Sequence, residues 1–350
     1  MFHLKIMYSR VVNTVAFLVA SLVFAPALAS AETYEWYARS SAPQGYLAEF
    51  VYADLAYGDG QSIYVPSVHT RHIPWGGPGG LHIVGPESKA VPHALSLAWM
   101  SFNENKLYAG RFDLPASDIR ALFQSQGPNG RGVADSGHRS VIVGVAPYGA
   151  VSVWVQTNQS RVLVATFTAQ EADIPFSRLA PNAVIGRDDY VDSTLKSYVE
   201  RHPEMAEVLQ KPVPDYWSSI YLAEYRWRPV FDFPEGAEIL AFRMETYNGE
   251  MFDFLADDPA MSSVTSRAVP RYMRISWRLG TQEYRLRIEF NDFEVLRAFQ
   301  YASEPSDVTS VDFVISPELD EGRMALQLSV GSGDRWAYLV KPSFRWSRVD

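Results

Sequence analysis

The sequence has no cysteine, which excludes disulfide bonds, zinc sites built on cysteine and thiol catalysis. Basic residues are in deficit, because 31 Lys and Arg stand against 40 Asp and Glu and leave a formal charge of -9. An acidic chain without a basic stripe repels phosphate backbones, so we expect no nucleic-acid partner. Beyond the N-terminal segment there is no apolar run long enough to span a membrane.

Catalytic signatures are also missing. There is no Gly-x-Ser-x-Gly elbow, and the residues of Asp135-Ser136-Gly137-His138 lie too close in sequence to assemble a triad. Acidic pairs such as Asp188-Asp189 and Asp257-Asp258 fall in polar connections, which is typical of solvated turns. The sequence therefore predicts neither an enzyme nor a cofactor, although carboxylates gathered from different loops would still allow a hydrolase.

Residues 1–31 have the pattern of a secretory signal peptide. Lys5 and Arg10 precede an apolar run, and small residues offer cleavage after Ala29 or Ala31. A membrane anchor is the alternative, but the run closes at Pro26, short of the roughly 20 residues that a bilayer requires. Cleavage would remove two basic residues and no acidic one, leaving a charge of -11. We expect a periplasmic protein without a lipid anchor, since no cysteine is available to carry one.

The remaining chain contains an internal repeat. Tyr46-Leu47-Ala48-Glu49-Phe50 recurs as Tyr221-Leu222-Ala223-Glu224-Tyr225. Further matches in the same order are Pro92, Trp99 and Phe112 with Pro270, Trp277 and Phe290, and Arg120-Ala121-Leu122-Phe123-Gln124 with Arg297-Ala298-Phe299-Gln300. Matches in the same order at nearly constant spacing indicate two copies of one domain. The prediction is a first domain over 32–190, a connector over 191–215 and a second domain over 216–350.

Each predicted domain has the pattern of an antiparallel sheet with one covering helix, a mainly β (α+β) fold. Apolar alternation predicts strands at 95–99, 107–112, 141–145, 151–155 and 162–167, and again at 272–279, 284–290, 311–315, 324–330 and 336–340. Ser117 is the expected N-cap of the first helix. The second helix is expected over 292–301 with Phe293, Leu296 and Phe299 inward. In the connector, helical spacing is broken at Pro203, and Lys211-Pro212-Val213-Pro214 predicts an extended hinge.

Three groups of residues are candidates for binding. His69, His72, His82 and His93 could ligate a metal, but proline and glycine punctuate this segment and no carboxylate has ligand spacing, so a loop without metal is expected. Trp75-Gly76-Gly77 lacks the ending of a phosphate-binding loop and predicts a surface loop with Trp75 exposed for recognition.

The third group is aromatic. Tyr216, Trp217, Tyr225, Trp227 and Arg228 have the composition of a binding hot spot. The alternation at Tyr225 and Trp227 equally fits one buried face of a strand, so a sheet core is the competing interpretation.

Several motifs resemble the bacterial domain of unknown function 2931. They are Ala42-Pro43-x-Gly45-Tyr46, Trp75-Gly76, Leu97-x-Trp99-x-Ser101, Tyr108-x-Gly110-x-Phe112-x-Leu114-Pro115, Gly144-Val145-Ala146-Pro147-x-Gly149 leading to Trp154, Tyr225-x-Trp227-Arg228-Pro229 and Asn248-Gly249-Glu250. The resemblance implies an exported protein, usually a lipoprotein, and similarity to immunity proteins that neutralise lipase toxins of the type VI secretion system. This chain departs from that pattern because it lacks the lipid-bearing cysteine.

The expected function is therefore periplasmic binding of a protein toxin. An exported carboxylate-dependent hydrolase and a structural protein of the cell envelope are the alternatives. The hydrolase alternative predicts that single Asp or Glu substitutions abolish turnover. The structural alternative predicts constitutive abundance with no toxin gene nearby.

Overall fold

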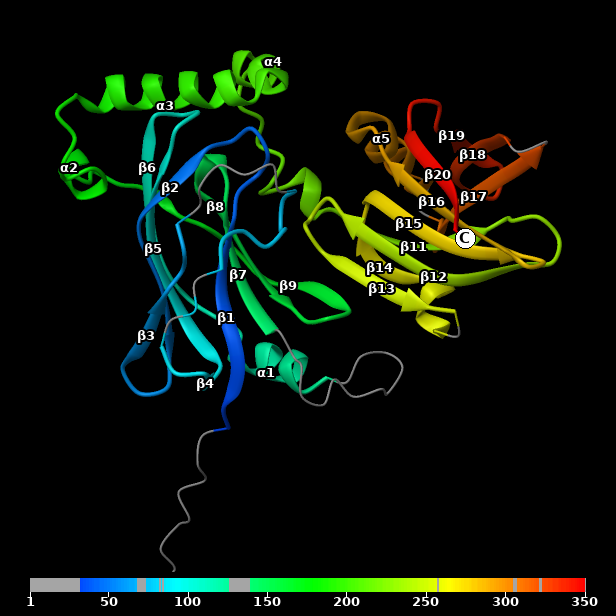
Figure 1. The fold of residues 1–350 in the computed structure, drawn as a ribbon, viewed down its shortest axis with the longest axis horizontal. Helices are drawn as coiled ribbons and strands as arrows, with labels where there is room; N and C mark the ends of the chain where they lie inside the picture. The colour runs from blue at the N-terminus through cyan, green and yellow to red at the C-terminus, as the bar shows by residue number, and fades with distance from the viewer. Residues whose placement is uncertain are drawn as a thin grey trace, which may run out of the picture. The chain divides into compact units, whose positions relative to one another are not determined.

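Apolar residues at every second position build about half of the described chain into strands, which form three sheets (Figure 1). The computed structural model describes residues 32–67, 74–81, 83, 85–125, 139–256, 258–304, 307–320 and 323–349. The predicted signal peptide and the Asp135-Ser136-Gly137-His138 segment lie outside these residues. Among the described residues, no helix combines the length and apolarity needed to cross a membrane.

The first half of the chain is a sandwich of two five-stranded layers. One layer has the order β4-β1-β7-β8-β9 and the other β10-β6-β5-β2-β3. The strands are β1 (Tyr34–Ser41), β2 (Ala48–Tyr57), β3 (Gln61–Tyr64), β4 (Ser88–Lys89), β5 (Pro92–Ser101), β6 (Lys106–Asp113), β7 (Arg139–Val145), β8 (Ala150–Gln156), β9 (Ser160–Thr168) and β10 (Gln170–Glu171). Their inward side chains, with Ile119 and Phe123 of α1 (Ala116–Gln124), form one buried core.

The second half repeats this arrangement of strands. Its layers have the orders β14-β11-β17-β18-β19 and β20-β16-β15-β12-β13. The strands are β11 (Glu224–Phe231), β12 (Ala237–Thr246), β13 (Met251–Leu255), β14 (Thr265–Ala268), β15 (Pro270–Leu279), β16 (Gln282–Glu289), β17 (Val311–Asp320), β18 (Arg323–Ser332), β19 (Arg335–Tyr338) and β20 (Ser343–Val349). Helix α5 (Asp292–Ser303) packs on β18 and β19, and the core includes Trp227, Phe299 and Phe313.

One strand pair joins the two sandwiches into a ten-stranded sheet. β13 pairs antiparallel with β9, with Met251 opposite Arg161 and Phe252 opposite Ser160. The layer of the second half that contains β13 thereby continues the layer of the first half that contains β9.

The connecting segment is mainly helical. It holds α2 (Phe176–Leu179), α3 (Arg187–Arg201), α4 (Ala206–Gln210) and the 3-10 turns η2 (Pro203–Met205) and η3 (Ile220–Leu222). Val191 and Tyr198 of α3 are buried in a cluster with Met100 and Leu107 of the first sandwich. The helix break at Pro203 is as predicted.

All the predicted strands and both predicted helices are present, and three expectations are wrong. Each half contains two layers rather than one antiparallel sheet, and β1 with β7 and β11 with β17 are parallel pairs. Pro115, not Ser117, precedes α1, with no side-chain cap. Phe293 lies at the exposed start of α5, and Phe299 faces the core as predicted, together with Val295 and Ala298.

Candidate functional site

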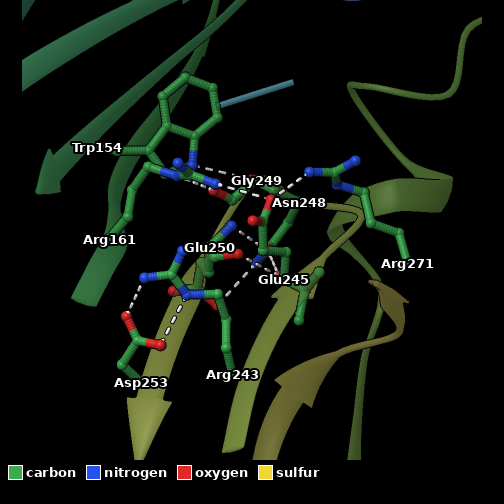
Figure 2. Close-up of polar contacts among 10 residues, drawn as sticks. Trp154, Arg161, Arg243, Glu245, Asn248, Gly249, Glu250, Asp253 and Arg271 are labelled. Atoms are coloured by element: carbon green, nitrogen blue, oxygen red, sulfur yellow. Dashed lines mark hydrogen bonds and ion pairs between the residues drawn. The ribbon is translucent and has the colours of Figure 1, made fainter. Parts of the chain in front are cut away.

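The turn between β12 and β13 docks the second half onto the first. Trp154 of β8 donates its indole N–H to the carbonyl of Asn248 at 3.0 Å, and Arg161 of β9 donates from Nε to the carbonyl of Gly249 (Figure 2). The backbone N–H of Leu163 donates to Glu250 Oε1 at 3.1 Å. Burial raises the pKa of Glu250, although its hydrogen bonds from Asn248 and Leu163 act in the opposite direction.

Glycines allow two backbones to touch beside this turn. Gly76 and Gly249 have φ values of +78° and +86°, a region that favours glycine. A Cβ on Gly76 would lie 2.5 Å from the carbonyl oxygen of Gly249. Trp75 packs edge-on against Trp154, with ring centroids 4.9 Å apart, and is only 5% exposed. The expectation of an exposed Trp75 is therefore wrong, because the glycine-rich loop packs into the junction.

Charged side chains of the second half extend from the junction. Arg271 forms an ion pair with Glu245, and Arg161 Nη2 lies 3.6 Å from the same carboxylate. Arg243 donates from Nε to Asp253 Oδ1 at 2.7 Å (Figure 2). Burial lowers the pKa of Arg161 to about 10, which leaves its guanidinium charged at neutral pH.

A groove of about 820 Å³ opens beside this network. Its lining comes from the loop after β1, the glycine-rich loop, the connector, and β12, β15, β16 and the start of α5. The aromatic lining residues are Tyr46, Trp75, Tyr216, Trp217, Tyr221, Tyr247, Tyr272, Phe290 and Phe293. The charged ones are Lys211, Arg243, Glu245, Arg271, Glu289 and Asp292, and the prolines are Pro43, Pro74, Pro212 and Pro214. The volume lies within the usual range of ligand sites, roughly 300–1,000 Å³.

Two tyrosines fix a carboxylate in the lining. Tyr221 and Tyr247 donate their hydroxyls to Oδ2 and Oδ1 of Asp292 at 3.0 and 2.7 Å, and the two rings are stacked 5.0 Å apart. Burial, with the charge of Asp292, raises the pKa of both tyrosines. Both hydroxyls therefore remain donors at neutral pH and hold the first turn of α5 in place.

Some polar atoms of the lining lack partners. Tyr46 meets Trp217 edge-on at 4.7 Å, and burial raises the pKa of Tyr46 to about 12. Among the described residues, no hydrogen-bond partner is present for the indole nitrogens of Trp75 and Trp217 or for Nε of Arg271. All three atoms are donors.

Phe293 connects the groove to a second aromatic surface. Helix α5 and the end of β19 enclose a hollow of about 410 Å³, and Phe293 lines both this hollow and the groove. Phe293 is 64% exposed, and Tyr301, Tyr338 and Val340 of the same region are also exposed. We call this region, with Phe293, the α5–β19 surface.

The structure brings together only part of the predicted binding surface. Trp75, Tyr216 and Trp217 line the groove, whereas Gly76, Gly77, Tyr225, Trp227 and Arg228 do not. The alternative of a sheet core is correct for Trp227, which is fully buried and packs against Phe299 at 5.3 Å. Tyr225 is half-buried against Phe299, and Arg228 is exposed in an ion pair with Asp312.

The predicted histidine segment falls mostly outside the described residues. His69, His72 and His82 belong to the undescribed part, and His93 is exposed on β5. Within the part that the structure describes, no three His, Asp or Glu side chains are close enough to hold a metal ion.

Sequence reasoning missed Arg271, Tyr247 and Asp292 as groove residues. Their contacts join distant positions, as with the 71 residues between Tyr221 and Asp292. The repeated Tyr-Leu-Ala-Glu segment at Tyr46 and Tyr221 was the available signal, because both tyrosines line the groove.

Comparison with known families supplies one match. The family described as "Protein of unknown function (DUF2931)" matches residues 25–215, more than half of the 350 residues. The chain belongs to the DUF2931 family. The DUF2931 match includes Trp75 and the four prolines that line the groove, but it ends before Tyr216. No curated protein and no solved structure matches this DUF2931 protein.

Proposed function

We propose that this DUF2931 protein is an exported binding protein that captures a partner protein at the groove and the adjoining α5–β19 surface. The continuity of these two regions through Phe293 carries the proposal. Their rings belong to residue types that dominate interface hot spots, and adjoining exposed apolar side chains mark binding surfaces. The partner's side chains would cover Phe293 and Tyr338, which are both more than half exposed.

The proposed partner is a secreted antibacterial toxin of the lipase type, and the proposed action is immunity in the periplasm. This part of the proposal rests on the resemblance of the motifs to immunity proteins of the type VI secretion system. Binding would block the toxin by occlusion and would need no chemistry from this chain. The acidic net charge, -9 for the full sequence and -11 after removal of the predicted signal peptide, favours encounter with a basic partner.

We also propose that the two sandwiches are tandem copies of one domain. The identical strand orders support this proposal. So does the sequence match between Lys89-Ala90-Val91-Pro92 in the first half and Arg267-Ala268-Val269-Pro270 in the second. Each segment places its cation over a buried tryptophan, Lys89 at 5.1 Å from the Trp36 ring and Arg267 at 5.3 Å from the Trp227 ring. In both cases the indole N–H donates to a carbonyl of the same segment, at Ala90 or Arg267.

The test is capture and growth rescue. Toxins encoded beside this gene are directed to the periplasm of a sensitive strain, with and without this protein, and complexes are isolated. We expect rescue by the wild type and at least tenfold weaker binding for Phe293→Asp and Tyr338→Asp, as for hot-spot residues in general (about 2 kcal/mol or more). Val184→Asp is the matched control, because Val184, between α2 and α3, is fully exposed. Absence of rescue by every toxin, together with no captured partner, contradicts the proposal.

A hydrolase is the second candidate because Glu245, Glu289 and Asp292 line the same groove. Binding is the better-supported function, since Asp292 is held by two tyrosines and Glu245 by Arg271. Turnover of a lipid or glycan ester that Glu289→Gln abolishes would favour the hydrolase.

A further inference from the structure

One wall of the groove is a Pro-x-Pro segment of the chain itself. Pro212 and Pro214 line the groove, and Lys211 before them has φ -84° and ψ 153°, close to polyproline II values. Tyr148 donates its hydroxyl to the carbonyl of Val213, between the two prolines, at 2.9 Å. An aromatic hydroxyl outside the groove lining thus already holds this extended proline segment by its backbone carbonyl.

The charges of the groove balance. Lys211, Arg243 and Arg271 stand against Glu245, Glu289 and Asp292, and the arginines are already paired with carboxylates. A charged ligand would gain little from a lining whose charges cancel and are engaged. An uncharged segment fits this lining better.

Three donor atoms of lining residues are buried and have no hydrogen-bond partner among the described residues. Trp75 Nε1, Trp217 Nε1 and Arg271 Nε are all donors, and each buried donor without a partner costs about 1–3 kcal/mol. An occupant that offers acceptors and few donors would relieve this cost. Proline-containing peptides have this property, because proline has no N–H and the polyproline II backbone leaves its carbonyls free.

We propose that the groove binds an extended, uncharged, proline-containing peptide segment of the partner protein. This inference rests on the proposed binding function and specifies the part of the partner that enters the groove. Its prolines pack against Tyr216, Trp217 and Phe293, and its carbonyls accept from the indole N–H groups, as in other aromatic grooves that recognise such segments. The indole nitrogens are buried, so the inference requires that the side chains covering them move when a carbonyl arrives.

The probe is an acetylated, amidated decapeptide of alternating proline and alanine, titrated into the purified full chain. Calorimetry measures affinity, and tryptophan fluorescence reports the shift of the rings around Trp75 and Trp217. We expect saturable binding of the proline peptide. The same peptide with glycine in place of proline should bind with at least about tenfold lower affinity. Tyr216→Ala and Phe293→Ala should each lower affinity about tenfold, while Val184→Ala leaves it unchanged. Thermal melts establish that each variant is folded.

Three outcomes overturn the inference. They are no saturable binding of the proline peptide, equal affinity for the glycine peptide, and binding of the neutral sugar N-acetylchitotetraose in its place with the same dependence on Tyr216 and Phe293. Capture of a whole partner by a protein that ignores the proline peptide would remove this inference and leave the proposed function standing. Binding of the peptide without any captured partner would have the reverse effect.

Discussion

At the scale of single residues, two effects restrict substitution of Gly249, its backbone conformation and the close packing around it, and they can be measured separately. Its φ of +86° strains any other residue, and a Cβ would meet Trp154 Cζ2 at 2.9 Å. Gly60, in the turn between β2 and β3, has φ +68° with nothing within 4 Å. We expect Gly60→Ala to cost about 1 kcal/mol and Gly249→Ala about 3 kcal/mol, because only the second adds overpacking to backbone strain. Urea unfolding of both variants measures the difference, and equal losses would show that Trp154 does not restrict Gly249.

The sequence reveals this glycine but not its contact. Asn248-Gly249-Glu250 stands out as a turn motif, yet its docking partner Trp154 is 94 residues away from Asn248. Trp75 shows the same limit, since its place among prolines and glycines suggested exposure while the tertiary contact with Trp154 buries it.

At the scale of elements, the two matching helices begin differently. The side chain of Asn291 accepts from the N–H of Glu294 at 3.2 Å and caps α5, whereas α1 follows Pro115 without a side-chain cap. We expect Asn291→Ala to lower the free energy of unfolding by about 1 kcal/mol and Ser117→Ala to change it by at most a few tenths. Chemical denaturation distinguishes them, and an equal loss for Ser117→Ala would restore Ser117 as the cap.

Periodicity located both helices and the strands β5–β9 and β15–β19, about half of the strands in the described chain, and it left choices open that only tertiary contacts decide. In α5 the stripe through Phe293 and Leu296 and the stripe through Val295 and Ala298 both have helical spacing. The core selects the second, because Phe293 in the first turn lies beyond the sheet at the rim of the groove. Likewise β1 and β7 were not recognisable as a parallel pair, since pairing partners distant in sequence leave no local signal.

At the scale of the whole molecule, Arg161 couples the two sandwiches. It binds the Gly249 carbonyl and lies against Glu245, and its guanidinium is nearly fully buried. We expect the wild type to unfold in one transition, and Arg161→Ala to lose about 3 kcal/mol and unfold in two, because the buried Gly249 carbonyl loses its donor while Glu245 keeps only its ion pair with Arg271. Arg226→Ala is the control, because the Arg226 side chain is exposed on β11. Urea unfolding followed by fluorescence and circular dichroism checks this, and a single transition at the wild-type midpoint for Arg161→Ala would contradict it.

The β9–β13 pairing also bears on the two sheet edges that take no part in it. Among the described strands, β3 and β19 occupy the corresponding outermost places and remain unpaired on one side, so a further chain could in principle extend the sheet at either end. By ladder register, β19 presents Trp336 where β9 presents Arg161, and β18 presents Ser329 where β8 presents Trp154. The free edge at β19 therefore lacks both side chains by which β8 and β9 hold the turn between β12 and β13, so we expect it to bind such a turn less firmly.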